Sequence, residues 1–164
     1  MPEPTGSLLH LLRHAHAGDP YEWDGPDELR PLSKRGRRQA ERLGIFLRER
    51  GIRADVIVAS PKVRARQTAD LVAAAFGLSV VLDERLTGFL DLASVEAIVA
   101  SNKGASTMLV GHDPDFSELL SELCGASGLV MKKGALATLE IVTPLRPGGA
   151  TLRWLLPPEL LTEA

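Results

Sequence analysis

Aromatic residues and cysteine are scarce in this sequence. Only 4% of its 164 residues are aromatic, so few side chains are available to stack on the bases of single-stranded nucleic acid. The single cysteine, Cys124, excludes an intramolecular disulfide framework and a zinc site built from thiolates. Cys124 lies near the end of an apolar helical stretch, and we expect it to be a packed residue without a catalytic role.

The chain also lacks an excess of positive charge. Lys and Arg number 19 and Asp and Glu number 21, so the net charge is −2. We therefore expect neither nucleic acid nor a membrane as a partner, and any anion must be recognised by a local group of side chains. Residues 1–5 carry no basic segment, and His10 and Arg13 interrupt the apolar stretch that follows. We expect no secretion signal, no membrane anchor and a cytoplasmic location.

The sequence pattern predicts alternating strands and helices in a single domain, residues 1–164. Short apolar runs predict strands at 7–12, 55–59, 79–82 and 107–110. Capped or amphipathic stretches predict helices at 33–51, 61–76, 95–100 and 114–123. Two further strands, 135–142 and 151–156, flank a Pro/Gly turn and predict a hairpin. This order is typical of an α/β domain with a mostly parallel central sheet and an antiparallel edge strand.

Four side chains suited to phosphate chemistry follow the predicted strands. Arg13 and His14 follow the first strand, Arg64 lies in the first turn of the helix after the second, and His112 follows the fourth. The carboxyl ends of parallel strands meet at one edge of the sheet, where ligands bind. Guanidinium groups suit phosphate oxygens, so we expect Arg13 and Arg64 to bind phosphate. A neutral imidazole can accept a phosphoryl group, and His14, closest to a strand end, is the predicted nucleophile.

The remaining groups at this edge are expected to support the transfer. Charge on a transferring phosphoryl group spreads over its oxygens, and His112 would help the two arginines to stabilise it before water releases the phosphate. Ser60 and Pro61 suit the N-cap and first position of the helix that carries Arg64. That helix N-terminus would add oriented N–H groups to the pocket.

His16 allows a metal site as an alternative. His14, His16 and His112 would make a three-histidine site, which Asp19 or Asp113 could complete. Two arginines at the same edge would repel a cation. We therefore expect no metal, and we assign His16 to substrate binding.

Other polar residues have simpler interpretations. His10, inside the first strand, is expected to be a hydrogen-bonded core histidine. A basic cluster is expected to be a solvated surface, with attraction of phosphorylated or acidic partners as a secondary possibility; it comprises Arg30, Lys34, Arg35, Arg37 and Arg38.

Three ordered segments carry a family resemblance. They are Arg13-His14-Ala15, the decapeptide Ser-Pro-Lys-Val-Arg-Ala-Arg-Gln-Thr-Ala that begins at Ser60, and Val110-Gly111-His112. They resemble the three signature blocks of the histidine phosphatase superfamily, which is also called phosphoglycerate mutase-like. Further segments resemble the small SixA-like phosphohistidine phosphatases: Arg30-Pro31-Leu32-Ser33, Gly111-His112-Asp113-Pro114 and Lys132-Lys133-Gly134-Ala135. The resemblance spans residues 8–142.

This resemblance implies a fold, a reaction and roles for the four residues. The implied fold is a three-layer α/β/α sandwich, and the implied activity is that of a metal-independent phosphatase without an organic cofactor. By the same resemblance, His14 is the phospho-accepting nucleophile, and Arg13 and Arg64 hold the phosphate. His112 supports the transferring phosphoryl group.

Two positions depart from the commonest pattern of the superfamily. Ala15 replaces a glycine, as it does in SixA-like members. Gly88 stands where the mutase and broad phosphatase branches carry a glutamate as general acid. An alkoxide leaving group needs a proton, whereas the imidazole of a phosphohistidine leaves readily, so the missing acid favours a phosphohistidine substrate. Glu84 or Asp91 as a displaced acid is the alternative.

The short connection at residues 83–106 also bears on the substrate. It has room for one short helix and no large lid, and an open site admits a histidine carried by another protein. The sequence therefore predicts a phosphatase that acts on a phosphohistidine-carrying protein. One alternative is a phosphomonoesterase for small phosphorylated substrates, with Glu84 or Asp91 as acid. Another is a non-catalytic phosphate-binding signalling module, which the intact His14 disfavours.

Overall fold

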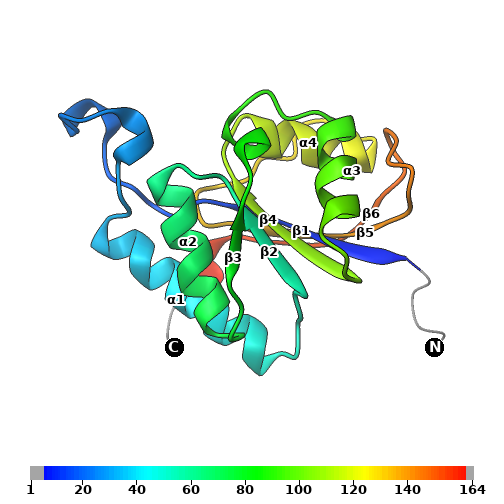
Figure 1. Cartoon of the computed structure of the whole chain (residues 1–164), viewed down its shortest axis with the longest axis horizontal. Coiled ribbons are helices and arrows are strands. Elements are labelled where there is room, and N and C mark those ends of the chain that lie inside the picture. Colours follow the sequence, from blue (N-terminus) through cyan, green and yellow to red (C-terminus); the bar gives the residue numbers. More distant parts are fainter. Residues whose placement is uncertain (1–5, 162–164) are drawn as a thin grey trace.

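A six-stranded sheet forms the centre of the protein (Figure 1). The structure is a computed structural model that describes residues 6–161. The sheet order is β3-β2-β4-β1-β5-β6. The strands are β1 (Ser7–Arg13), β2 (Val56–Ala59), β3 (Val80–Leu82), β4 (Ser106–Gly111), β5 (Leu136–Ile141) and β6 (Thr151–Leu156). The first four are parallel, whereas β5 runs antiparallel to β1, and β6, at the edge, runs antiparallel to β5. The predicted mixed sheet and its terminal hairpin are confirmed.

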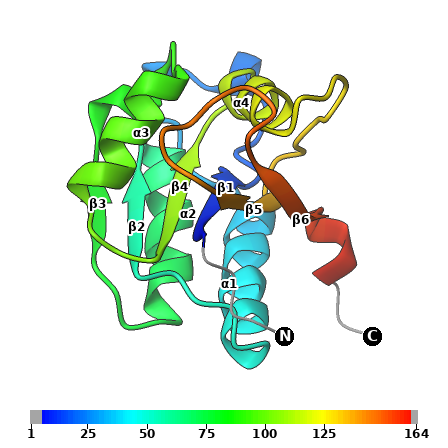
Figure 2. The same cartoon turned by 90° about the vertical axis from the view of Figure 1, so that its right-hand side faces the viewer.

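Helices cover both faces of this sheet, which confirms the predicted three-layer α/β/α sandwich (Figure 2). One face packs against α1 (Lys34–Glu49) and α2 (Val63–Ala74), and the other against α3 (Leu92–Ser101) and α4 (Asp115–Cys124). Three short 3₁₀ turns lie in the connections, η1 (Pro20–Glu22), η2 (Asp27–Leu29) and η3 (Glu84–Thr87), and a fourth, η4 (Pro158–Leu161), follows β6. The connection between β3 and β4 holds η3 and the single helix α3, as its length predicted.

The central strand β1 shows why its sequence is almost continuously apolar. Leu9 and Leu11 are fully buried in the cluster formed with α3 and α4, while Leu12 is buried in the cluster formed with α1 and α2. Successive side chains of a strand point to opposite faces, so a strand covered on both sides must be apolar at nearly every position.

His10 is the exception in β1, and it is a core histidine as predicted. Its side chain is fully buried, with Nδ1 2.7 Å from Thr138 Oγ1 and Nε2 2.9 Å from Ser106 Oγ and 3.0 Å from the Arg53 carbonyl oxygen. Both ring nitrogens are therefore satisfied. Burial lowers the pKa of His10, which keeps the ring neutral inside the sheet.

Helix α1 begins where the sequence predicted. The Ser33 side chain accepts a hydrogen bond from the Gly36 N–H at 3.1 Å and caps the helix. Gly36 is required at this point, because a Cβ there would lie 1.9 Å from the His16 carbonyl oxygen. The first turn of α1 is thus pressed against the loop that follows β1.

The described part of the chain contains no helix that is both long and apolar enough to span a membrane. Residues 1–5, where we expected no secretion signal, lie outside the described residues.

Candidate active site

The structure brings the four predicted site residues together at the carboxyl ends of β1, β2 and β4. Strands β1 and β4 are parallel neighbours, with Arg13 opposite Gly111. The His14 N–H donates to the Gly111 carbonyl at 2.9 Å, and the rings of His14 and His112 lie 5.3 Å apart between centroids. All four residues therefore meet at the edge that the parallel-strand rule indicates.

Backbone hydrogen bonds fix the loop that carries His14. The Gly134 N–H lies 3.1 Å from the Arg13 carbonyl oxygen and 2.9 Å from that of His14. Gly134 has a φ of +81°, a conformation that favours glycine. On the other side, the Ala15 N–H donates to Thr68 Oγ1 at 3.1 Å, and the Thr68 hydroxyl donates to the Arg64 carbonyl at 2.7 Å. The loop is therefore tied to both β5 and α2.

His14 is held in the tautomer that a nucleophile needs. Its Nδ1 lies 2.8 Å from the Ala15 carbonyl oxygen. A carbonyl oxygen only accepts, so Nδ1 carries the ring hydrogen and Nε2 keeps its lone pair. Burial, with smaller effects from the charges of His112, Arg64 and Arg13, lowers the pKa of His14 to about 3. The ring is therefore neutral at neutral pH.

His112 is also neutral, and a hydroxyl group orients it. Burial and the charges of Arg64 and Lys62 lower its pKa to about 3. Its Nε2 lies 2.8 Å from Ser60 Oγ, which accepts a hydrogen bond from the Lys62 N–H at 3.2 Å. The Ser60 hydroxyl hydrogen is then available to His112 Nε2, which leaves the ring hydrogen on Nδ1.

The predicted capping role of Ser60 is wrong. Helix α2 begins at Val63, with Lys62 at the N-cap and no side-chain cap. Ser60 lies two residues too early to cap the helix. Instead, it is fully buried between β2 and His112, where its hydroxyl is a positioning group for the imidazole.

Both arginines are anchored at one end of the guanidinium group. Arg13 Nη1 donates to the Met131 carbonyl at 2.8 Å and lies 3.5 Å from Asp113 Oδ2. Arg64 Nη1 donates to the Asp27 carbonyl at 2.8 Å, and Nη2 donates to the Asp27 carboxylate at 3.0 Å. These bonds restrict the orientation of each planar group.

Three polar atoms of this site are buried without a partner. They are Arg13 Nε, Arg64 Nε and His112 Nδ1, and they are the unpartnered buried side-chain N and O atoms found within residues 6–161. A buried N–H without an acceptor is costly, and such groups are uncommon in folded proteins. An anion with several acceptor oxygens would satisfy all three, so the arrangement suits phosphate.

The basic character of the site extends to Arg30, for which the prediction of a solvated surface is wrong. Arg30 is buried, with Nη1 donating to the Ala17 carbonyl at 2.8 Å and Nε to the Asp27 carboxylate at 3.2 Å. Arg30 thus holds the loop together instead of facing solvent.

Two charged residues at the site carry no predicted role. Partial burial raises the pKa of Asp27, but the charge of Arg64 and hydrogen bonds from Arg30 and Arg64 outweigh it, so the pKa lies below its usual range. Asp27 is therefore an ionised partner of the arginines. Burial and the charge of Arg13 lower the pKa of Lys133, which faces the same cluster. The sequence signal for Lys133 is the Lys-Lys-Gly segment before β5.

His16 lies at the rim of this site. Its Nδ1 is 2.6 Å from Ser33 Oγ, and its backbone N–H donates to Gln39 Oε1 at 3.0 Å. Burial and the charges of Arg35 and Lys133 lower the pKa of His16. Within residues 6–161, no group of three or more His, Cys, Asp or Glu side chains has the arrangement of a metal site. The three-histidine arrangement is thus not assembled in the described chain.

Of the two candidates for a displaced acid, Asp91 is held as a helix cap. Asp91 is the N-cap of α3, and its carboxylate accepts a hydrogen bond from the Ser94 N–H at 2.8 Å, which lowers its pKa. A carboxyl group held ionised in this way is a poor proton donor. Glu84 is exposed in η3.

Comparisons with known proteins identify the family of this chain. Residues 9–89 match the histidine phosphatase superfamily (branch 1). An uncharacterised protein of Picosynechococcus is 30% identical over 142 residues, which cover 80% of this chain and 84% of that protein. A probable phosphoglycerate mutase, GpmB, of Klebsiella pneumoniae is 30% identical over 116 residues, which cover 65% of this chain. The alignment spans only about half, 51%, of that mutase.

Solved structures show the same architecture. The protein histidine phosphatase SixA, in a complex with tungstate, has a TM-score of 0.80 and 23% identity, with 94% of this chain and 99% of that chain covered. A putative phosphohistidine phosphatase SixA of Agrobacterium tumefaciens has a TM-score of 0.76 and 26% identity, with 92% and 97% covered. The fold is therefore similar to SixA over nearly the whole of both chains.

Proposed function

The chain belongs to the histidine phosphatase superfamily, in its SixA-like branch, and is a phosphatase, and we propose that its substrate is a protein phosphorylated on histidine. The observation that carries the proposal is the arrangement of His14 Nε2, free to attack, beside three buried N–H groups without acceptors. We assign His14 as the nucleophile and Arg13, Arg64 and His112 as the groups that bind and stabilise the phosphoryl oxygens. The single domain of residues 1–164 would carry the whole site.

The first step transfers the phosphoryl group to the enzyme. His14 Nε2 forms a bond to phosphorus while the N–P bond of the substrate phosphohistidine breaks. The departing imidazole leaves as a neutral ring when its other nitrogen carries a proton. The Nε groups of Arg13 and Arg64 and the Nδ1–H of His112 donate to the phosphoryl oxygens, whose charge they stabilise.

The second step returns the enzyme to its starting state. Water attacks phosphorus, the bond to His14 Nε2 breaks, and inorganic phosphate leaves with both hydrogens of the water. The Ala15 carbonyl keeps the hydrogen on His14 Nδ1, so phospho-His14 is a protonated phosphohistidine and its imidazole departs neutral. Neither step needs a carboxylic acid from the protein.

The missing acid supports phosphohistidine over phosphate esters. Gly88 stands where the mutase and broad phosphatase branches of the superfamily carry their acid, and Asp91 is ionised as a helix cap. An ester would leave as an alkoxide and would need the proton that these positions do not supply. A second candidate function, hydrolysis of small phosphate esters, would need Glu84, which is exposed in η3.

The experiment compares kcat/KM for a phosphohistidine peptide with kcat/KM for sugar phosphates. We expect a clear preference for the peptide, and a preference for the sugar phosphates would overturn the proposal.

His14→Ala should remove both activities, and quenching without acid should trap phosphate on His14 of the wild-type protein. Absence of the trapped phosphate would favour the non-catalytic phosphate-binding module. Activity should be unchanged by a chelator, and loss of activity would restore the metal alternative.

A further inference from the structure

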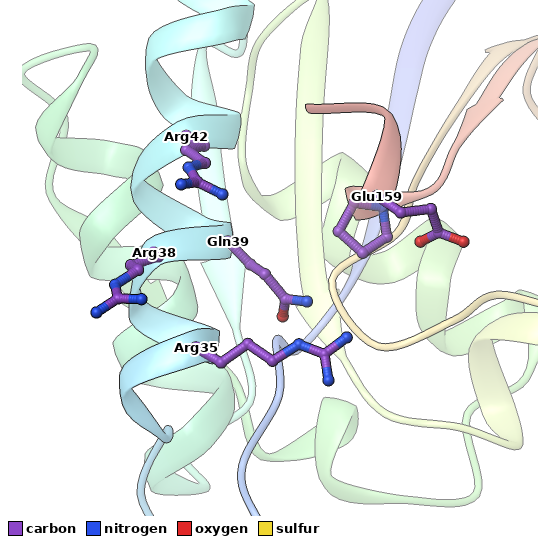
Figure 3. A pocket seen from close by; sticks show the side chains of 6 residues that line it. Arg35, Arg38, Gln39, Arg42 and Glu159 are labelled. Atoms are coloured by element: carbon purple, nitrogen blue, oxygen red, sulfur yellow. The ribbon is translucent and has the colours of Figure 1, made fainter. Parts of the chain in front are cut away.

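A basic pocket lies between α1 and the turn η4, on the side of α1 that faces the C-terminal segment (Figure 3). Its cavity of about 200 Å³ is lined by four residues of α1 and two of η4: Arg35, Arg38, Gln39, Arg42, Pro158 and Glu159. Figure 3 shows Arg35 and Gln39 extending from the helix toward the turn that carries Glu159. The pocket thus has a helical wall rich in arginine and a second wall with a proline.

The three arginines of this pocket form no ion pair within the described part of the chain. Within residues 6–161, no carboxylate lies at ion-pair distance from Arg35, Arg38 or Arg42. The one lining carboxylate, Glu159, is paired with Lys132 at 2.6 Å. The pocket is therefore positive, although the whole chain has a net charge of −2. Like charges three and four residues apart repel on a helix, so this row lowers the stability of α1 in the free protein.

The pocket adjoins the active site. Gln39 Oε1 accepts a hydrogen bond from the backbone N–H of His16 at 3.0 Å, and the charge of Arg35 helps to lower the pKa of His16. His16 is two residues from His14, a separation of at most about 7 Å along the chain. A protein that presents a phosphohistidine to His14 therefore comes close to the basic pocket.

We propose that the basic pocket docks an acidic helix of the phosphohistidine-carrying protein, an inference that rests on the proposed function. Arg35 and Arg42 are seven residues apart, which is about 10 Å along a helix. One phosphate group cannot bridge that length, whereas carboxylates on successive turns of a partner helix match it. Guanidinium groups bind carboxylates in paired hydrogen bonds, and opposite charges speed the encounter of the two proteins.

The test uses matched helical peptides of roughly 20 residues, a length at which helix formation becomes favourable. Each peptide contains one histidine, phosphorylated chemically. One set carries three glutamates at spacings of three and four residues, beginning one, two or three turns from the phosphohistidine. The other set carries glutamines at the same positions. Wild-type protein should hydrolyse at least one acidic peptide about ten-fold more efficiently in kcat/KM than its glutamine partner, and added salt should reduce the difference.

Charge reversal locates the effect on the pocket. Arg38→Glu with Arg42→Glu should abolish the preference for the acidic peptide through KM, while the glutamine peptide is hydrolysed as by wild type. Arg37→Glu with Arg48→Glu is the matched control, because these exposed arginines lie on α1 but do not line the pocket. The control should keep the preference. If the charge-reversed pocket variant does not fold, Arg38→Gln with Arg42→Gln should reduce the preference in the same direction.

The outcomes separate the docking site from the proposed function. Equal hydrolysis of every acidic peptide and its glutamine partner would overturn the docking site and leave the phosphohistidine activity intact. An equal loss of preference in the control variant would also overturn it, because the effect would then come from the overall charge of α1. If the wild-type protein hydrolyses neither set, the proposed function fails and the docking inference fails with it.

Discussion

Arg64 donates to Asp27 twice, through Nη1 to the backbone carbonyl at 2.8 Å and through Nη2 to the carboxylate at 3.0 Å. The two residues are 37 positions apart in the chain, so this contact joins the loop before α1 to the first turn of α2. It fixes the plane of the guanidinium group and leaves Nε buried without a partner. Arg64 is thus prepared for an anion before one arrives, which lowers the cost of ordering it during catalysis.

Arg64→Lys tests whether this fixed plane matters beyond the charge. A lysine keeps the positive charge but has one compact ammonium group, which cannot hold both contacts to Asp27 and also replace the Arg64 Nε–H that faces the phosphoryl group. We expect kcat/KM to fall about 100-fold, equivalent to about 2.7 kcal/mol of transition-state stabilisation. Steady-state kinetics with a phosphohistidine peptide measures the change. Arg66→Lys, at an exposed position of the same helix, is the control and should behave as wild type.

The buried histidines predict a loss of stability in mild acid. Burial lowers the pKa of both His14 and His112 to about 3, whereas an unfolded histidine titrates near 6.5. Between these values the unfolded chain binds more protons than the folded one, so the free energy of unfolding falls as pH falls below about 6.5. Each histidine contributes a loss of about 1.4 kcal/mol between about pH 7.5 and 5.5.

Urea unfolding of wild-type protein and of His14→Gln at these two pH values checks this expectation. Glutamine does not titrate, so the variant should lose about 1.4 kcal/mol less stability than the wild type over the same interval. Equal pH dependence of the two proteins would show that His14 titrates alike in the folded and unfolded chains. That result would contradict the neutral, desolvated nucleophile.

The strand ends explain how much of the site could be predicted from the sequence. Apolar runs covered on both faces identify parallel strands, and the residues directly after them must meet at one edge. Arg13, His14 and His112 follow such runs, and Arg64 follows one after a short turn, so their convergence was predictable.

The loop between His16 and Ser33 has no periodic pattern, and its contribution was not predictable. Asp27 is part of the site because Arg64, on the distant helix α2, donates to it, and Arg30 joins the site through its own bond to Asp27. No local sequence pattern indicates these contacts. The same limit applies to Ser60, whose residue type suits a helix cap but whose hydroxyl orients His112. Local propensity indicates what a polar side chain can do, while tertiary packing decides which partner it finds.

Ser60→Ala tests the role of that hydroxyl. The variant removes the group within 2.8 Å of His112 Nε2, so the ring loses the contact that favours a hydrogen on Nδ1. We expect kcat to fall about ten-fold with a smaller change in KM, because the hydrogen bond from Nδ1 matters most in the transition state. Nitrogen NMR of the His112 ring should report a mixture of tautomers. A single unchanged tautomer with normal kcat would contradict the assignment.

Gly134→Ala tests whether the turn before β5 holds the catalytic loop. The φ of Gly134 is +81°, so a residue with a Cβ would be strained there, and that Cβ would lie 3.3 Å from Gln39 Oε1 and 3.4 Å from Pro158. The Gly134 N–H is hydrogen-bonded to the carbonyl oxygens of Arg13 and His14. Gly128→Ala is the matched control, because it has a φ of +75° and nothing within 4 Å of its Cβ.

Both substitutions should cost about 1 kcal/mol of folding stability, since each places a side chain in the left-handed region. Only Gly134→Ala should also lower kcat, because a shift of its N–H moves the two carbonyls that set the positions of Arg13 and His14. Thermal unfolding measures the shared cost, and hydrolysis of a phosphohistidine peptide measures the difference. Equal activities in the two variants would mean that the Gly134 turn stabilises the fold without positioning the nucleophile.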